Sequence, residues 1–136
     1  MSAPRSHPAI IVETLRQALG DAVAVYRFGS SAAGVTHRAS DVDVAVLAAS
    51  PLRPTERFDL QEQVASRLGR DVDLVDLRSA STVMAMQVVS TGEVLFDGAP
   101  AARGAFEDRI FSSYARLNEE RRGILERIAA EGSVYG

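Results

Sequence analysis

Apolar and polar residues alternate along this chain with two different periods, one typical of helices and one typical of strands. Apolar residues at helical spacing predict helices over Pro8–Leu19, Thr55–Leu68 and Ser79–Ser90. Shorter apolar runs predict strands over Val23–Phe28, Asp41–Leu47, Asp71–Leu77 and, as a short edge strand, Glu93–Phe96. This alternation indicates an α/β or α+β fold in which helices cover a sheet.

The last third of the chain contains one long helical pattern, which begins after Pro100. Its apolar stripe consists of Phe106, Ile110, Tyr114, Leu117, Ile124, Leu125 and Ile128. The stripe either packs on the sheet or contributes to the docking of a partner. We therefore expect a single domain over residues 1–136, with a core over residues 8–97 and a helical extension over residues 100–131.

Acidic residues interrupt two of the predicted strands, although aspartate is depleted from strands in general. Asp41 and Asp43 are two residues apart, so in a strand their side chains project to the same face. Asp71 and Asp73 repeat this spacing in the third strand, whereas Asp76 has the opposite parity. Two fixed carboxylates on one face repel each other unless a cation lies between them.

Magnesium is the cation that best suits such a group of acids. It prefers oxygen ligands and is usually bound by one or two carboxylates together with substrate phosphates. If the third strand neighbours the second, one of its acids completes a site of three carboxylates. Three carboxylates can hold two metal ions, an arrangement that clamps the attacking and leaving oxygens in phosphoryl-type transfers.

Gly29 and Ser30 follow the first strand at a predicted strand-to-helix turn. Glycine lets the backbone approach a ligand without an intervening Cβ atom. A serine just beyond it offers a hydroxyl and free N–H groups to phosphate oxygens. Together with the acids, this turn predicts a binding site for a nucleoside triphosphate beside a binding site for a metal ion.

The composition limits the classes of function. The absence of cysteine excludes disulfides, thiolate zinc sites and a cysteine nucleophile. The net charge of −3 argues against direct binding to nucleic acid, which relies on basic surfaces. No segment approaches the roughly 20 apolar residues that a membrane span requires. We therefore expect a cytoplasmic protein that contacts neither nucleic acid nor a membrane.

Gly29-Ser30, ten further residues and Asp41-Val42-Asp43 resemble the signature of the nucleotidyltransferase superfamily, whose fold is shared with DNA polymerase beta. The short chain and the run over residues 72–77 are similar to its minimal nucleotidyltransferases, or MNT domains. The resemblance implies the polymerase-beta-like fold, with a short mixed sheet covered by helices and a long C-terminal helix.

The C-terminal segment resembles one branch of these minimal enzymes. Its long helix, with Tyr114 and Arg121, and the closing residues 132–136 are similar to members encoded beside HEPN-domain proteins. Those members act as type VII antitoxins. The resemblance implies a protein adenylyltransferase that transfers AMP from ATP to a tyrosine of a HEPN ribonuclease toxin. It also implies two Mg²⁺ ions as cofactors.

The family pattern also implies roles for individual residues. Gly29 and Ser30 would contact the triphosphate, and Asp41 and Asp43 would be metal ligands. Asp73 would be the third carboxylate, which binds the catalytic metal and helps to deprotonate the acceptor hydroxyl.

Two features of the site are not fixed by this pattern. Asp71 lies on the same predicted strand face as Asp73 and is the alternative third carboxylate. Family members often carry an arginine where this chain has Ala33, so a positive charge near the phosphates is missing. Arg27, His37 or Arg38 could compensate for it.

The acceptor must dock from outside, because the sheet and its helices use almost all residues up to Phe96. A folded protein partner fits this geometry. Two other functions share the same residues. The chain could be an antitoxin that acts by binding alone, or a small-molecule nucleotidyltransferase such as one that modifies aminoglycosides, although such relatives usually carry extra domains.

Overall fold

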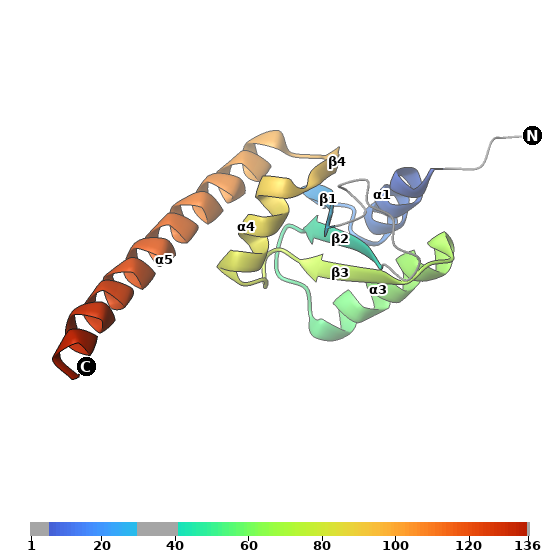
Figure 1. The fold of residues 1–136 in the computed structure, drawn as a ribbon. Helices are drawn as coiled ribbons and strands as arrows, with labels where there is room; N and C mark the ends of the chain where they lie inside the picture. Colours follow the sequence, from blue (N-terminus) through green and yellow to red (C-terminus); the bar gives the residue numbers. More distant parts are fainter. Residues whose placement is uncertain (1–5, 30–40, 136) are drawn as a thin grey trace, which may run out of the picture.

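The computed structural model describes residues 6–29 and 41–135, and every statement about the structure refers to these ranges (Figure 1). The helices are α1 (His7–Ala18), α3 (Pro54–Leu68), α4 (Thr82–Thr91) and α5 (Pro100–Tyr135). The strands are β1 (Ala24–Phe28), β2 (Val42–Leu47), β3 (Val72–Asp76) and β4 (Glu93–Asp97). The predicted elements are all present, with ends that differ by one to a few residues.

The four strands form one mixed sheet in the order β3-β2-β1-β4. Strand β1 is antiparallel to both of its neighbours, and β2 and β3 are parallel. The predicted short mixed sheet covered by helices, with a long C-terminal helix, is therefore confirmed (Figure 1).

Each face of the sheet has its own hydrophobic core, because side chains alternate between the faces along each strand. Val42, Val44 and Val46 face α1 and α3, where they pack with Leu15 and Val64. The opposite face packs against α4 and the first turns of α5. Its buried residues include Ala24, Tyr26, Phe28, Ala45, Leu47, Leu77, Ala85, Val88 and Phe106.

Helix α4 begins later than its sequence predicts. The prediction placed the first residue at Ser79, but the helix starts at Thr82 and its N-cap is Ser81, whose side chain accepts a hydrogen bond from the Met84 N–H. The Ser79 hydroxyl is used elsewhere, because it donates to Asp76 Oδ2 over 2.8 Å. Both serines are suitable caps by residue type, and the buried acceptor decides between them.

Side chains from α3 close the outer edge of β3. The Leu74 N–H donates to Gln61 Oε1, and Arg57 donates to the Leu74 carbonyl oxygen, both over 3.0 Å. Arg57 also donates to Gln61 Oε1, so the two side chains hold each other in place. The central residue of this edge strand therefore has both main-chain groups paired.

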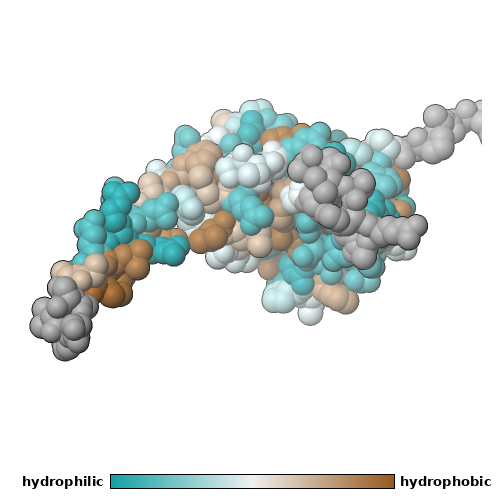
Figure 2. All heavy atoms as spheres, viewed as in Figure 1, coloured by the Kyte–Doolittle hydropathy of each residue, from teal (hydrophilic) through white to brown (hydrophobic). Residues whose placement is uncertain are grey.

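Helix α5 extends well beyond the sheet (Figure 1). Phe106 is buried near its base, whereas Ile124, Leu125 and Ile128 are 47%, 61% and 58% exposed. Only the first part of the predicted stripe therefore packs on the body of the protein, and Figure 2 shows apolar side chains on the projecting part. Among the helices that the structure describes, none is both long and apolar enough to cross a bilayer.

Candidate active site

The predicted acids lie together at one end of the sheet. Asp43 is the second residue of β2 and Asp73 the second residue of β3, and the parallel register places them directly side by side. The antiparallel register of β1 places Phe28 opposite Asp43 on the same face. Gly29 follows Phe28 directly, so the glycine and both acids meet at this end of the sheet.

Asp41 and Asp71 lie just outside the strands, because β2 begins at Val42 and β3 at Val72. The main chain joins their ends, since the Val42 N–H donates to the Asp71 carbonyl oxygen over 2.9 Å. Both side chains are exposed. The edge thus carries four carboxylates, with Asp43 the least exposed of them.

The surroundings of Asp43 disfavour the charged form of its carboxyl group. Burial raises the pKa of the Asp43 carboxyl, and the negative charges of Asp73 and Asp41 raise it further. The buried ring of Phe28, opposite in the register, lies on the same side of the sheet. Asp73 contributes to this shift because the register of β2 and β3 places it beside Asp43.

Gly29 has a conformation and a position that only glycine fits. Its φ angle is +76°, in the left-handed region. A Cβ atom at Gly29 would collide with Oδ2 of Asp43. The glycine backbone therefore lies directly against the carboxylate, and this contact leaves no room for a side chain between β1 and the acids.

A divalent cation is compatible with this end of the sheet. Its donors are carboxylate oxygens, which Mg²⁺ prefers, and their mutual repulsion raises the pKa of Asp43 in the absence of a positive charge. Within residues 6–29 and 41–135 no three acid or histidine side chains form a ready-made metal site.

Asp76 has a structural role, in agreement with its opposite parity. It is 5% exposed and accepts hydrogen bonds from the main-chain N–H groups of Leu52 and Arg78 and from the Ser79 hydroxyl. These bonds join β3 to the loop before α3 and to the turn before α4. The side chain lies at the opposite end of β3 from Asp73.

We expect Asp76→Ala to lower the free energy of unfolding by roughly 2–4 kcal/mol, because three partly buried hydrogen bonds to the buried Asp76 carboxylate are lost. Thermal unfolding followed by circular dichroism measures this loss. The matched control is Asp59→Ala on the exposed side of α3, which should change stability by less than about 0.5 kcal/mol. Equal losses in the two variants would contradict the structural role of Asp76.

Arg27 does not compensate for the arginine that is missing at Ala33. It pairs in register with Val44, so its side chain projects to the face opposite Asp43. There its Nη2 lies 2.8 Å from Oε2 of Glu93. The other two candidates for compensation, His37 and Arg38, lie outside the described residues, as do Ala33 and the predicted triphosphate contact Ser30.

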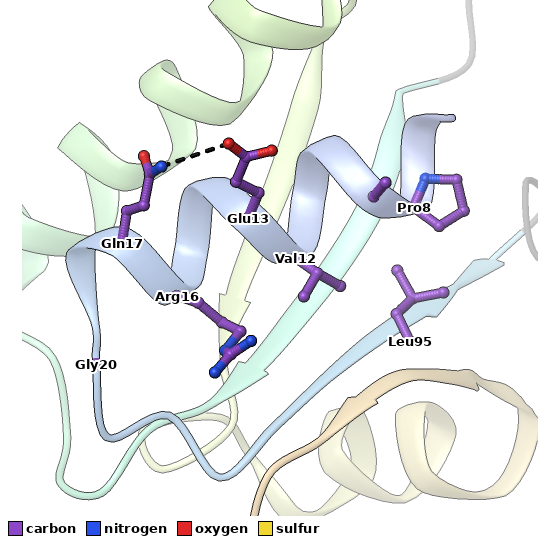
Figure 3. A pocket seen from close by; sticks show the side chains of 8 residues that line it. Pro8, Val12, Glu13, Arg16, Gln17, Gly20 and Leu95 are labelled. Atoms are coloured by element: carbon purple, nitrogen blue, oxygen red, sulfur yellow. Dashed lines mark hydrogen bonds between the residues drawn. The ribbon is translucent and has the colours of Figure 1, made fainter. Parts of the chain in front are cut away.

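A groove between α1 and β4 is separate from this site. It is lined by Pro8, Val12, Glu13, Arg16 and Leu95, among others (Figure 3). The groove lies on the α1 face of the sheet, whereas Asp43 and Asp73 project to the α4 face. The guanidinium of Arg16 lies over the Phe96 ring, 4.5 Å from its centroid. The groove therefore has no contact with the acids.

Known proteins resemble the chain over most of its length. Residues 11–100 match the family described as polymerase beta, nucleotidyltransferase. The protein adenylyltransferase MntA of Shewanella oneidensis is 42% identical over 120 residues, which are 88% of this chain and 86% of MntA.

Solved structures agree with this match. A crystal structure of a toxin-antitoxin with AMP-PNP has a TM-score of 0.81 at 41% identity and covers 89% of this chain and 97% of its own. A rebuilt structure of a tri-AMPylated Shewanella oneidensis HEPN toxin in complex with MNT antitoxin has a TM-score of 0.75 at 38% identity, with coverage of 90% and 95%. The chain belongs to the polymerase beta nucleotidyltransferase family.

Proposed function

We propose that this protein is an antitoxin that transfers AMP from ATP to a tyrosine hydroxyl of a cognate HEPN ribonuclease toxin. The observation that carries the proposal is the 42% identity to a protein adenylyltransferase over 88% of the chain. A related antitoxin forms a complex with a tri-AMPylated HEPN toxin. Adenylate groups add bulk and negative charge to the toxin, so they repel RNA phosphates in the way that phosphorylation blocks an anion site.

The acids and the turn at Gly29 have different roles in the proposed reaction. We infer that Asp41, Asp43 and Asp73 hold Mg²⁺, as two ions, and that Gly29 and Ser30 contact the triphosphate. When bound, Mg²⁺ neutralises phosphate charge and lowers the pKa of the attacking hydroxyl. The support for this assignment is the register that pairs Asp43 with Asp73 and the close approach of Gly29 to Asp43.

The transfer itself is a substitution at phosphorus. The tyrosine oxygen forms a bond to the α-phosphorus of ATP, the bond from that phosphorus to the bridging oxygen breaks, and pyrophosphate leaves. The hydroxyl proton passes to a carboxylate oxygen of Asp73. Positioning and charge neutralisation supply most of the acceleration in such reactions.

Intact-protein mass spectrometry tests this proposal. The purified protein, ATP, Mg²⁺ and the HEPN protein encoded beside it are mixed, and the HEPN protein is weighed. We expect mass gains in steps of one adenylate, which are absent without ATP. No gain in the complete mixture would overturn the proposal.

Neutralisation by binding alone is the second candidate, because the described residues hold no ready-made metal site. Growth rescue separates the two functions. We expect the double variant Asp41→Asn/Asp43→Asn to bind the toxin but to lose rescue of toxin-expressing cells at ordinary expression. Full rescue by this variant would show that binding suffices and that transfer is incidental.

A further inference from the structure

A polar cluster at the base of α5 takes no part in the proposed reaction. The Tyr26 hydroxyl donates to Oε2 of Glu107 over 2.7 Å, and Nη1 of Arg103 lies 2.8 Å from the same oxygen. Nε of Arg103 lies 3.1 Å from Oδ2 of Asp97. These four side chains, from β1, β4 and α5, are called the base cluster below.

The base cluster holds its members firmly. Tyr26 is 1% exposed. Burial and the neighbouring Glu107 carboxylate raise the pKa of the Tyr26 hydroxyl, so it stays protonated and donates. Asp97 and Glu107 both pair with Arg103, whose charge balances theirs in part. A hydrogen bond from a neutral hydroxyl to a carboxylate is among the stronger kinds in proteins.

The position of the base cluster connects α5 to the active end of the sheet. Tyr26 is three residues before Gly29 on β1. Helix α5 starts at the other end of that strand, where Asp97 pairs with Ala24 and the Gly98 N–H donates to Val23. Phe106 supplies the apolar contact at the same place. The packing of the base of α5 against α4, the apolar contact of Phe106 and the polar cluster together set the direction of a helix that then leaves the body (Figure 1).

Because α5 is long, a small change in its direction at the base causes a large displacement of its far end. The helix rises by about 33 Å between Phe106 and Ile128, at about 1.5 Å per residue. A tilt of about 10° at the base would move Ile128 by roughly 6 Å on this rise. A misplacement of about 1 Å at a reacting centre already costs about 100-fold in rate.

We propose that Tyr26, Glu107 and Arg103 are positioning residues that fix the direction of α5, and thereby the placement of a protein acceptor relative to Asp43 and Asp73. This inference rests on the proposed function, because only an acceptor that touches α5 is sensitive to its direction. The exposed Ile124, Leu125 and Ile128 are the part of α5 that such an acceptor would touch.

The direction of α5 can be measured without any assay of activity. The chain has no cysteine, so spin labels at Gln63→Cys on α3 and Arg127→Cys on α5, both exposed positions, report one distance. Double electron–electron resonance should give a narrow distribution in this labelled parent. Tyr26→Phe/Glu107→Leu removes both partners of the Tyr26–Glu107 hydrogen bond and leaves Arg103 its ion pair with Asp97, and it should broaden the distribution several-fold.

Two control variants and one substitute variant accompany that measurement. Asp108→Leu makes the same kind of change one residue further along, on the exposed side of α5, and should keep the narrow distribution. Glu107→Gln retains an acceptor oxygen for the Tyr26 hydroxyl and should also keep the narrow distance distribution. If the double variant fails to fold, Arg103→Met replaces it, because it removes the ion pairs to Asp97 and Glu107. An unchanged distribution in the folded variant would overturn the inference.

Kinetics then test the link to the acceptor. The double variant without spin labels should lower kcat/KM for the HEPN protein by roughly tenfold or more, and leave the affinity for ATP unchanged. A fall in ATP affinity, or an unchanged kcat/KM for the HEPN protein despite a broadened distribution, would overturn the positioning role. If the parent transfers no adenylate at all, the proposed function fails, and the distance measurement still decides whether the base cluster directs α5.

Discussion

Asp43→Asn should abolish adenylate transfer and at the same time stabilise the fold. We expect the rate to fall by roughly 1,000-fold or more, because the substitution removes a charge from the centre of the acid group. The carboxylate is partly buried between Asp41 and Asp73, and this surrounding raises its pKa. The charged form is therefore less favourable in the folded protein than in the unfolded chain.

The sign of the stability change follows from the raised pKa of the Asp43 carboxyl. Above the ordinary pKa of aspartate, ionisation of Asp43 lowers the free energy of unfolding, and the loss disappears when the pH falls below that value. Without Mg²⁺ at pH 7, Asp43→Asn should therefore raise Tm by a few degrees, and the gain should vanish near about pH 3. Thermal unfolding in EDTA at both pH values measures it.

Asp59→Asn is the matched control for this prediction, since Asp59 is exposed on α3. It should change neither the rate nor Tm. A lower Tm for Asp43→Asn, or loss of its folded circular dichroism spectrum, would mean that Asp43 is a structural residue instead.

Gly29→Ala should be the second severe substitution. The new Cβ atom would collide with Oδ2 of Asp43, and the φ angle of +76° is strained for alanine. We expect a loss of about 1–2 kcal/mol in stability from the backbone strain. The displaced carboxylate should lower the transfer rate by about 100-fold or more.

The chain offers a control with the same strain but no collision. Gly69 ends α3 with a φ angle of +68°, and a Cβ atom there would meet nothing within 4 Å. Gly69→Ala should therefore lose a similar amount of stability and retain its activity. Calorimetry and the mass assay measure the two effects separately. Equal activity in the two variants would show that the contact between Gly29 and Asp43 is unimportant.

Local patterns were enough to predict the elements of the fold. Helical spacing and strand runs located all eight described elements, because most of them bury one face in a core. The ends were less certain, as α4 shows. Ser79 and Ser81 are equivalent caps by type, and only the three-dimensional position of Asp76 removes Ser79 from the choice.

Contacts between distant residues account for what the sequence left open. The spacing of Asp71 and Asp73 could not identify the nearer neighbour of Asp43, because the register of β2 and β3 decides it. The base cluster had no signal in the sequence, since Tyr26 and Glu107 are 81 residues apart. The metal, triphosphate and acceptor roles of the site residues remain predictions.

The closure of β3 by Gln61 and Arg57 has a consequence for how the molecule behaves at high concentration. An open strand at the border of a sheet recruits further strands and so promotes fibril growth. In this protein, the N–H and carbonyl groups of Leu74, at the centre of edge strand β3, are hydrogen-bonded to the side chains of Gln61 and Arg57. These two hydrogen bonds therefore oppose the addition of a strand from another copy at the edge of the sheet that carries Asp73.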